Sequence, residues 1–95
     1  MTDNRRQYDR QAQRSIMRVA PKDEPAGEQI AILKDISRGG ILIEVEKAIN
    51  VGTIVSIELP KTRFGPPRRL SGRVMWWAPS SETQGWRQVG CRFGR

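Results

Sequence analysis

Hydrophobic and polar residues alternate along much of this chain with a period of two residues. The clearest example is the segment 40–46, Gly-Ile-Leu-Ile-Glu-Val-Glu, where Ile41, Ile43 and Val45 fall on one side of an extended backbone. Successive side chains of a strand point to opposite faces, whereas an amphipathic helix repeats every 3.6 residues. The pattern therefore predicts a β-strand that buries one face.

Five more short segments are rich in apolar or β-branched residues or show the same alternation, and turn-forming residues separate them. Glycine and proline gather between the segments, as in Gly65-Pro66-Pro67, and both residue types interrupt regular structure. Short strands with turns at regular spacing predict an all-β barrel or sandwich, not alternating strands and helices. The six predicted strands cover residues 15–20, 28–37, 40–46, 53–59, 68–77 and a final segment that includes 89–93.

The alternation also sorts the large aromatic residues of the fifth predicted strand. It places Trp76 on one face with Leu70 and Val74, and it sends Trp77 to the opposite face. Large aromatic side chains in so small a chain usually belong to the core, so we predict that Trp76 is buried. Trp77 is then a candidate to cover a partner or the rim of a ligand.

The residue inventory limits the chemistry of this chain. Its 95 residues make one small domain, histidine is absent, and Cys91 is the only cysteine. Histidine is the commonest general base, and a lone cysteine forms neither an internal disulfide nor a cysteine metal cluster. No nucleophile with a base can be assembled from what remains. We therefore expect a non-catalytic protein with no metal and no cofactor, in which Cys91 is a small core residue.

Positive charge dominates the sequence, because 17 lysines and arginines face 10 acidic residues and give a formal net charge of +7. Such a balance favours an anionic partner, and phosphate is the obvious candidate. The basic residues are concentrated before residue 19 and at 61–73. A small barrel that binds RNA or DNA through phosphate contacts is one function this charge would serve, with Arg63, Arg68, Arg69 and Arg73 as contacts.

The first 14 residues differ from the rest because they offer almost nothing to bury except Tyr8. We expect a flexible basic N-terminal arm at 1–14, followed by a barrel at 15–95. The N-terminus is not followed by an apolar signal region, and no apolar run is long enough for a transmembrane helix. These features predict a cytoplasmic protein without membrane insertion.

A polar hinge joins the second and third predicted strands. Asp35 and Ser37 share one face of the extended chain, while Ile36 points to the other. Gly39 and Gly40 follow, and glycine permits positive φ and the close approach of another segment or a flat ligand. Taken alone, this cluster is an ordinary hairpin turn.

The arm carries a second motif that changes this interpretation. Arg6 and Arg10 form RxxxR, Arg5 precedes them, and the hinge reads DxSxxG. Together with the closing segments Gly72-Arg73-Val74 and Val89-Gly90-Cys91-Arg92-Phe93, these motifs resemble the PilZ domain, a bacterial receptor module for cyclic di-GMP. The resemblance implies a six-stranded antiparallel barrel. Many family members add a helix after the last strand, and because this chain stops at Arg95 we expect none.

The resemblance implies that the RxxxR arginines, Arg6 and Arg10, grip guanine and phosphate groups. A guanidinium can donate as a fork to guanine O6 and N7 and can stack on a purine. Arg14 also takes part in overlapping RxxxR pairs, with Arg10 and with Arg18, and remains the alternative. We prefer Arg6 with Arg10 because Arg5 completes the form usual in the family. The resemblance further implies that a basic residue at Arg5 favours capture of two stacked ligand molecules.

In the hinge, Asp35 could accept from guanine N1–H or N2–H, and Ser37 could reach a phosphate or a base edge. Gly39 and Gly40 would keep the floor of the site open, and Trp77 is a further candidate at its rim. The sequence thus predicts a cyclic di-GMP receptor that clamps its ligand between arm and hinge. Ordering of the arm would signal to an unidentified protein partner.

Two other functions remain open. The nucleic-acid-binding barrel explains the charge equally well, but it leaves Asp35 and Ser37 without a role. A PilZ domain used only as a protein-docking surface is the other, and the intact ligand motifs disfavour it.

Overall fold

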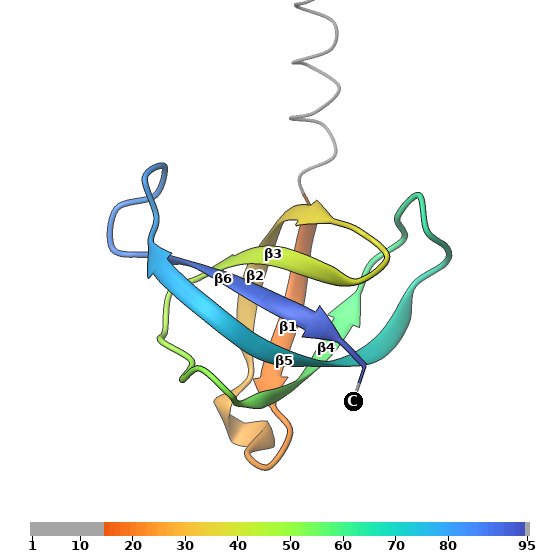
Figure 1. Ribbon diagram of the computed structural model, residues 1–95, viewed down its shortest axis with the longest axis horizontal. Helices are drawn as coiled ribbons and strands as arrows, with labels where there is room; N and C mark the ends of the chain where they lie inside the picture. The colour runs from red at the N-terminus through yellow and green to blue at the C-terminus, as the bar shows by residue number, and fades with distance from the viewer. Residues whose placement is uncertain (1–14, 95) are drawn as a thin grey trace, which may run out of the picture.

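The computed structural model describes residues 15–94, which form a closed barrel of six antiparallel strands (Figure 1). The order around the barrel is β1-β2-β3-β6-β5-β4, so the last strand lies between β3 and β5. This confirms the predicted six-stranded antiparallel barrel. The strands are β1 (Ser15–Pro21), β2 (Gln29–Ile36), β3 (Gly40–Val45), β4 (Ile54–Leu59), β5 (Arg68–Pro79) and β6 (Arg87–Phe93), and a short 3-10 turn covers Pro25–Gly27.

Alternate residues of the strands fill the barrel. Ile43, Ile57 and Val89 are fully buried, each at an inward position of its strand, and Ile43 is opposite Val89 in the β3–β6 ladder. Burying a side chain of this size stabilises the fold by about 1.5–3 kcal/mol. Cys91 belongs to this core cluster, as predicted. Its burial raises the pKa of the thiol to about 11, which keeps it neutral and unreactive.

A β-bulge at Lys34 breaks the regular alternation of β2. Leu33 is opposite Ile43 and Asp35 is opposite Leu42, so Lys34 is the extra residue on its strand. Because one residue is inserted, Leu33 and Ile36 both pack on the core, while Lys34 and Asp35 lie on the outer side. The bulge thus directs the hinge aspartate away from the core.

A second bulge, at Met75 in β5, overturns one prediction. Val74 is opposite Cys91, but Trp76 is opposite Gly90, so the alternation is reset between them. Trp76 therefore lies on the outer face and is 46% exposed instead of buried. The predicted core position of Trp76 is wrong because a strand pattern read without its partner strand does not reveal an inserted residue.

The described residues include no membrane-spanning helix and end just after β6. No helix within residues 15–94 is long and apolar enough to cross a membrane. After β6 ends at Phe93, Gly94 is the last described residue.

Candidate functional site

The β2–β3 hairpin holds the polar hinge in a defined conformation. The Ser37 N–H donates to the Gly40 carbonyl at 2.9 Å, and the Ser37 hydroxyl lies 3.5 Å from the same oxygen. Asp35 Oδ1 accepts from the Ile36 N–H at 2.8 Å. Both side chains are in exposed residues at the outer surface, so the predicted shared face of Asp35 and Ser37 is confirmed.

The hairpin is fixed from two sides by other parts of the barrel. The Phe93 N–H of β6 donates to the Gly39 carbonyl at 2.9 Å. The Arg63 guanidinium, in the β4–β5 connection, donates to the Ile36 carbonyl at 3.3 Å. These contacts make the hairpin part of a preformed surface instead of a loose turn.

The two hinge glycines have different roles from one another. A Cβ on Gly40 would collide with the Cys91 carbonyl oxygen of the neighbouring strand, whereas a Cβ on Gly39 would meet nothing within 4 Å. Close approach at Gly40 is therefore confirmed. The suggested use of positive φ is wrong, because neither glycine is among the positive-φ residues of the described chain. The hairpin needs Gly40 for space and not for a left-handed backbone.

One row of outward positions runs from the hinge aspartate across four strands. Asp35 is opposite Leu42, Leu42 is opposite Gly90, and Gly90 is opposite Trp76. A Cβ on Gly90 would collide with the Trp76 indole, so the indole lies directly against this glycine. The row has a carboxylate at one end and a half-exposed aromatic ring at the other.

A second row, next to the first, carries positive charge. Gly40 is opposite Arg92, and Arg92 is opposite Arg73. Both arginines are exposed. We call the outer surface of β2, β3, β6 and β5 that holds these two rows the hinge face.

Trp77 lies outside both rows. It is opposite Val89, and the Arg87 guanidinium carbon is 5.7 Å from the centroid of its ring. Trp76, which the sequence reasoning assigned to the core, is the tryptophan in line with Asp35. The pairing of Gly90 with Trp76 would have indicated the outward position of this tryptophan, but the pairing cannot be derived from the sequence without the strand register.

Four predicted site residues, Arg5, Arg6, Arg10 and Arg14, lie outside the described residues, and so does the predicted arm at 1–14. The first described residue, Ser15, is opposite Leu33, two residues before Asp35. Because β1 and β2 are antiparallel, β1 begins at the same end of the barrel as the hinge.

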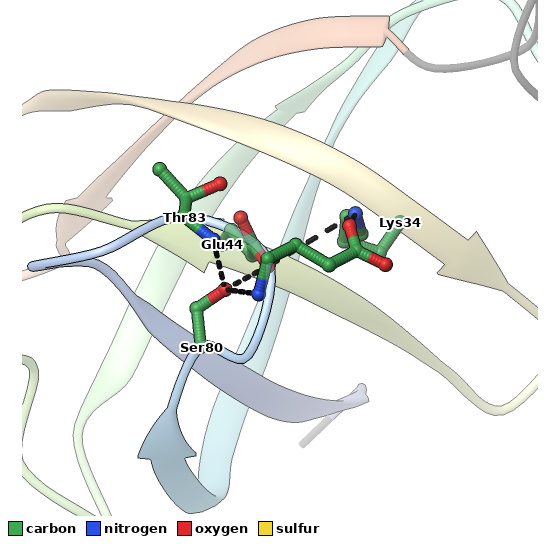
Figure 2. Close-up of polar contacts among 5 residues, drawn as sticks. Lys34, Glu44, Ser80 and Thr83 are labelled. Carbon is green, nitrogen blue, oxygen red and sulfur yellow. Dashed lines mark hydrogen bonds and ion pairs between the residues drawn. The ribbon is translucent and has the colours of Figure 1, made fainter.

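A buried polar cluster supports the bulge that positions Asp35 (Figure 2). Glu44 points outward from β3, yet it is 0% exposed because the β5–β6 loop packs on it. Its Oε2 accepts from the Ser80 hydroxyl at 2.6 Å and lies 3.9 Å from Lys34 Nζ. Lys34 also pairs with Glu82, and the Glu82 and Thr83 N–H groups donate to the Ser80 hydroxyl oxygen at 3.1 and 3.0 Å.

This cluster was not foreseen from the sequence, where Glu44 looked like an ordinary outward residue. It holds Lys34, the inserted residue of the β2 bulge, with a side chain only 12% exposed. Because the bulge determines which way Asp35 points, Lys34 and Glu44 act on the hinge without touching its surface. Within residues 15–94 no group of three or more His, Cys, Asp or Glu residues could hold a metal ion.

Comparison with known proteins gives one finding for the whole chain. A family model described as the PilZ domain matches residues 4–95. The matched range includes RxxxR and the hinge. No curated protein and no solved structure gives a significant match to the chain.

Proposed function

This chain belongs to the PilZ domain family, a family of cyclic di-GMP receptors, and from that premise we propose that it binds cyclic di-GMP on the hinge face. The observation that carries the proposal is the row that joins Asp35 to Trp76. It brings a carboxylate and an aromatic ring to one side of the barrel, and guanine needs both an acceptor at its edge and a surface for its ring.

Asp35 is the acceptor in this proposal. One carboxylate oxygen accepts from the Ile36 N–H, and the other has no hydrogen-bond partner within residues 15–94. That oxygen can accept a hydrogen bond from the N1–H or N2–H group at the edge of guanine. Ser37, on the same side of the hairpin, reaches a phosphate or a base edge. Gly39 leaves space above it, while Gly40 lets the hairpin approach β6 closely.

Trp76 provides the stacking surface. The ring rests on Gly90 and is 46% exposed, so its position is fixed by the backbone beneath it before ligand arrives. Stacking of a base on an aromatic side chain contributes about 1–3 kcal/mol. Trp77, beside Arg87, is a second candidate at the edge of the site.

The N-terminal arginines complete the clamp in this proposal. Arg6 and Arg10 donate to guanine and phosphate, Arg5 favours a second stacked ligand molecule, and Arg14 is the alternative RxxxR partner. Because β1 begins at the hinge end of the barrel, the arm joins the barrel close to Asp35. Ligand would order the arm and so create a new surface for a downstream protein.

Isothermal titration calorimetry with cyclic di-GMP tests the proposal. We expect Asp35→Ala to weaken binding by about 1–3 kcal/mol, as for a lost base contact. Asp23→Ala removes the same charge from an exposed turn and is expected to leave the affinity unchanged. The proposal is wrong if the wild-type protein does not bind, or if both variants bind equally well.

The structure offers less support for a nucleic-acid interface. Of the four arginines suggested for it, Arg69 pairs with Glu58 at 2.7 Å and Arg63 donates to the Ile36 carbonyl. A single-stranded oligonucleotide in the same titration covers this function, since it would bind without regard to Asp35.

A further inference from the structure

We propose that Arg73 and Arg92 form a subsite for a phosphodiester group of the bound nucleotide. The inference rests on the proposed function and adds two contacts that neither motif contains. The two arginines lie directly opposite each other on β5 and β6, and Arg92 is also opposite Gly40 of the hinge. The subsite is therefore continuous with the hairpin.

Two like charges at opposed positions of an antiparallel ladder repel each other. Neighbouring acidic residues often relieve such a contact, but no acidic residue among the described positions 15–94 pairs with Arg73 or Arg92. The ion pairs found within residues 15–94 involve the basic residues Arg18, Lys34 and Arg69, and the row of Arg73 contains no acid. An anion between the two guanidinium groups would remove the repulsion.

The surface around the pair is hollowed. Arg73, Met75, Arg92, Phe93 and Gly94 line a depression of about 510 Å³, which lies in the usual range for small-molecule sites. Its walls are a mixture of two cationic forks and two apolar side chains. Such a lining suits a sugar-phosphate, because a guanidinium binds phosphate oxygens in a bidentate manner and the apolar groups contact the sugar.

The position of the pair relative to the guanine surface supports a phosphodiester of the same ligand. Along β6, Gly90 belongs to the Asp35–Trp76 row and Arg92 to the next row. Two residues along a strand span about 7 Å. A base stacked on the Trp76 ring, which covers Gly90, thus has its own sugar-phosphate within reach of Arg92 and Arg73.

The first test is a titration of the full chain with inorganic pyrophosphate. NMR of the arginine Nε–Hε groups monitors the titration. We expect saturable shifts at Arg73 and Arg92 that exceed those at Arg68, an exposed arginine at the first position of β5. Equal, non-saturating shifts at all three arginines would overturn the subsite, whether or not cyclic di-GMP binds.

The second test is calorimetry with cyclic di-GMP. We expect the double variant R73Q/R92Q to bind at least tenfold more weakly and to show a shallower dependence of affinity on salt, since fewer phosphate contacts remain. The control R68Q/R69Q also removes two positive charges, both from β5, and is expected to bind like wild type.

The outcomes separate the subsite from the proposed function. If wild type binds and R73Q/R92Q matches it, the subsite is wrong and the proposed function stands. If wild type does not bind, the proposed function fails, and the pyrophosphate test alone decides the subsite.

Discussion

Two regions of the barrel treat their outward arginines in opposite ways. Where β4 lies between β1 and β5, Arg69 is opposite Glu58 and lies 2.7 Å from it, and Arg18 lies 3.9 Å from Glu28. On the hinge face, Arg73 is opposite Arg92, and both lack an acidic partner within residues 15–94. The same small scaffold therefore neutralises some of its arginines and leaves the Arg73–Arg92 pair available. We propose that charges left unpaired at fixed positions mark the surface that would bind an anion.

The largest expected effect comes from the buried support of the hinge face. Lys34→Met leaves the Glu44 carboxylate buried and without its lysine, so we expect a loss of about 3–5 kcal/mol in unfolding free energy. Lys47→Met, at an exposed position, is the control and is expected to change stability little. Urea unfolding followed by tryptophan fluorescence measures both. Equal stability of the two variants would show that the cluster does not support the bulge.

Close packing beneath the hinge face gives the next effect. Gly40→Ala forces a methyl group against the Cys91 carbonyl and must separate β3 from β6, which we expect to cost about 1–3 kcal/mol. Gly39→Ala meets open space and should be nearly neutral. Thermal unfolding of the pair measures the difference, and similar midpoints would mean that the strands are not held so closely.

The two tryptophans of β5 sharpen the comparison through binding. Trp76→Ala should weaken the binding of cyclic di-GMP by about 1–3 kcal/mol through lost stacking. Trp77→Ala should weaken binding less, because Trp77 lies outside the Asp35 row. Calorimetry on both variants gives the order. The reverse order would move the stacking surface to the end of the barrel beside Arg87.

The smallest effect concerns the charges themselves. Without ligand, Arg92→Gln removes a like-charge contact and should raise stability by about 0.2–1 kcal/mol. Arg69→Gln breaks an exposed ion pair and should lower it by no more than about 1 kcal/mol. Thermal unfolding at low salt measures both changes. A loss of stability in Arg92→Gln would mean that Arg92 has a structural role on this face.

Local pattern was enough to predict most of the fold. Apolar and β-branched runs, with periods of two in several of them, predicted all six strands, and the ends of the first five lie within two residues of their observed positions. The bulges at Lys34 and Met75 were not predicted, because an inserted residue exists only relative to a partner strand. For the same reason, Trp76 was assigned to the wrong face.

The geometry of the candidate site was predicted in part, and its role in binding ligand stays a prediction. The hinge motif showed Asp35 and Ser37 correctly as outward neighbours, since both lie on one hairpin. The Arg73–Arg92 pair and the burial of Glu44 depend on the placement of β6 and of the β5–β6 loop, which sequence spacing does not contain. The roles of Arg5, Arg6 and Arg10, and the cytoplasmic location, stay predictions.

The position of β6 has a consequence for when the barrel can fold during synthesis. Both rows of the hinge face cross β6, at Gly90 and Arg92, and this strand also joins β3 to β5. During synthesis the earlier strands leave the ribosome without it, so neither the barrel nor the hinge face can be completed until β6 emerges. The proposed capacity to bind the nucleotide should therefore arise in a single step, once β6 has left the ribosome.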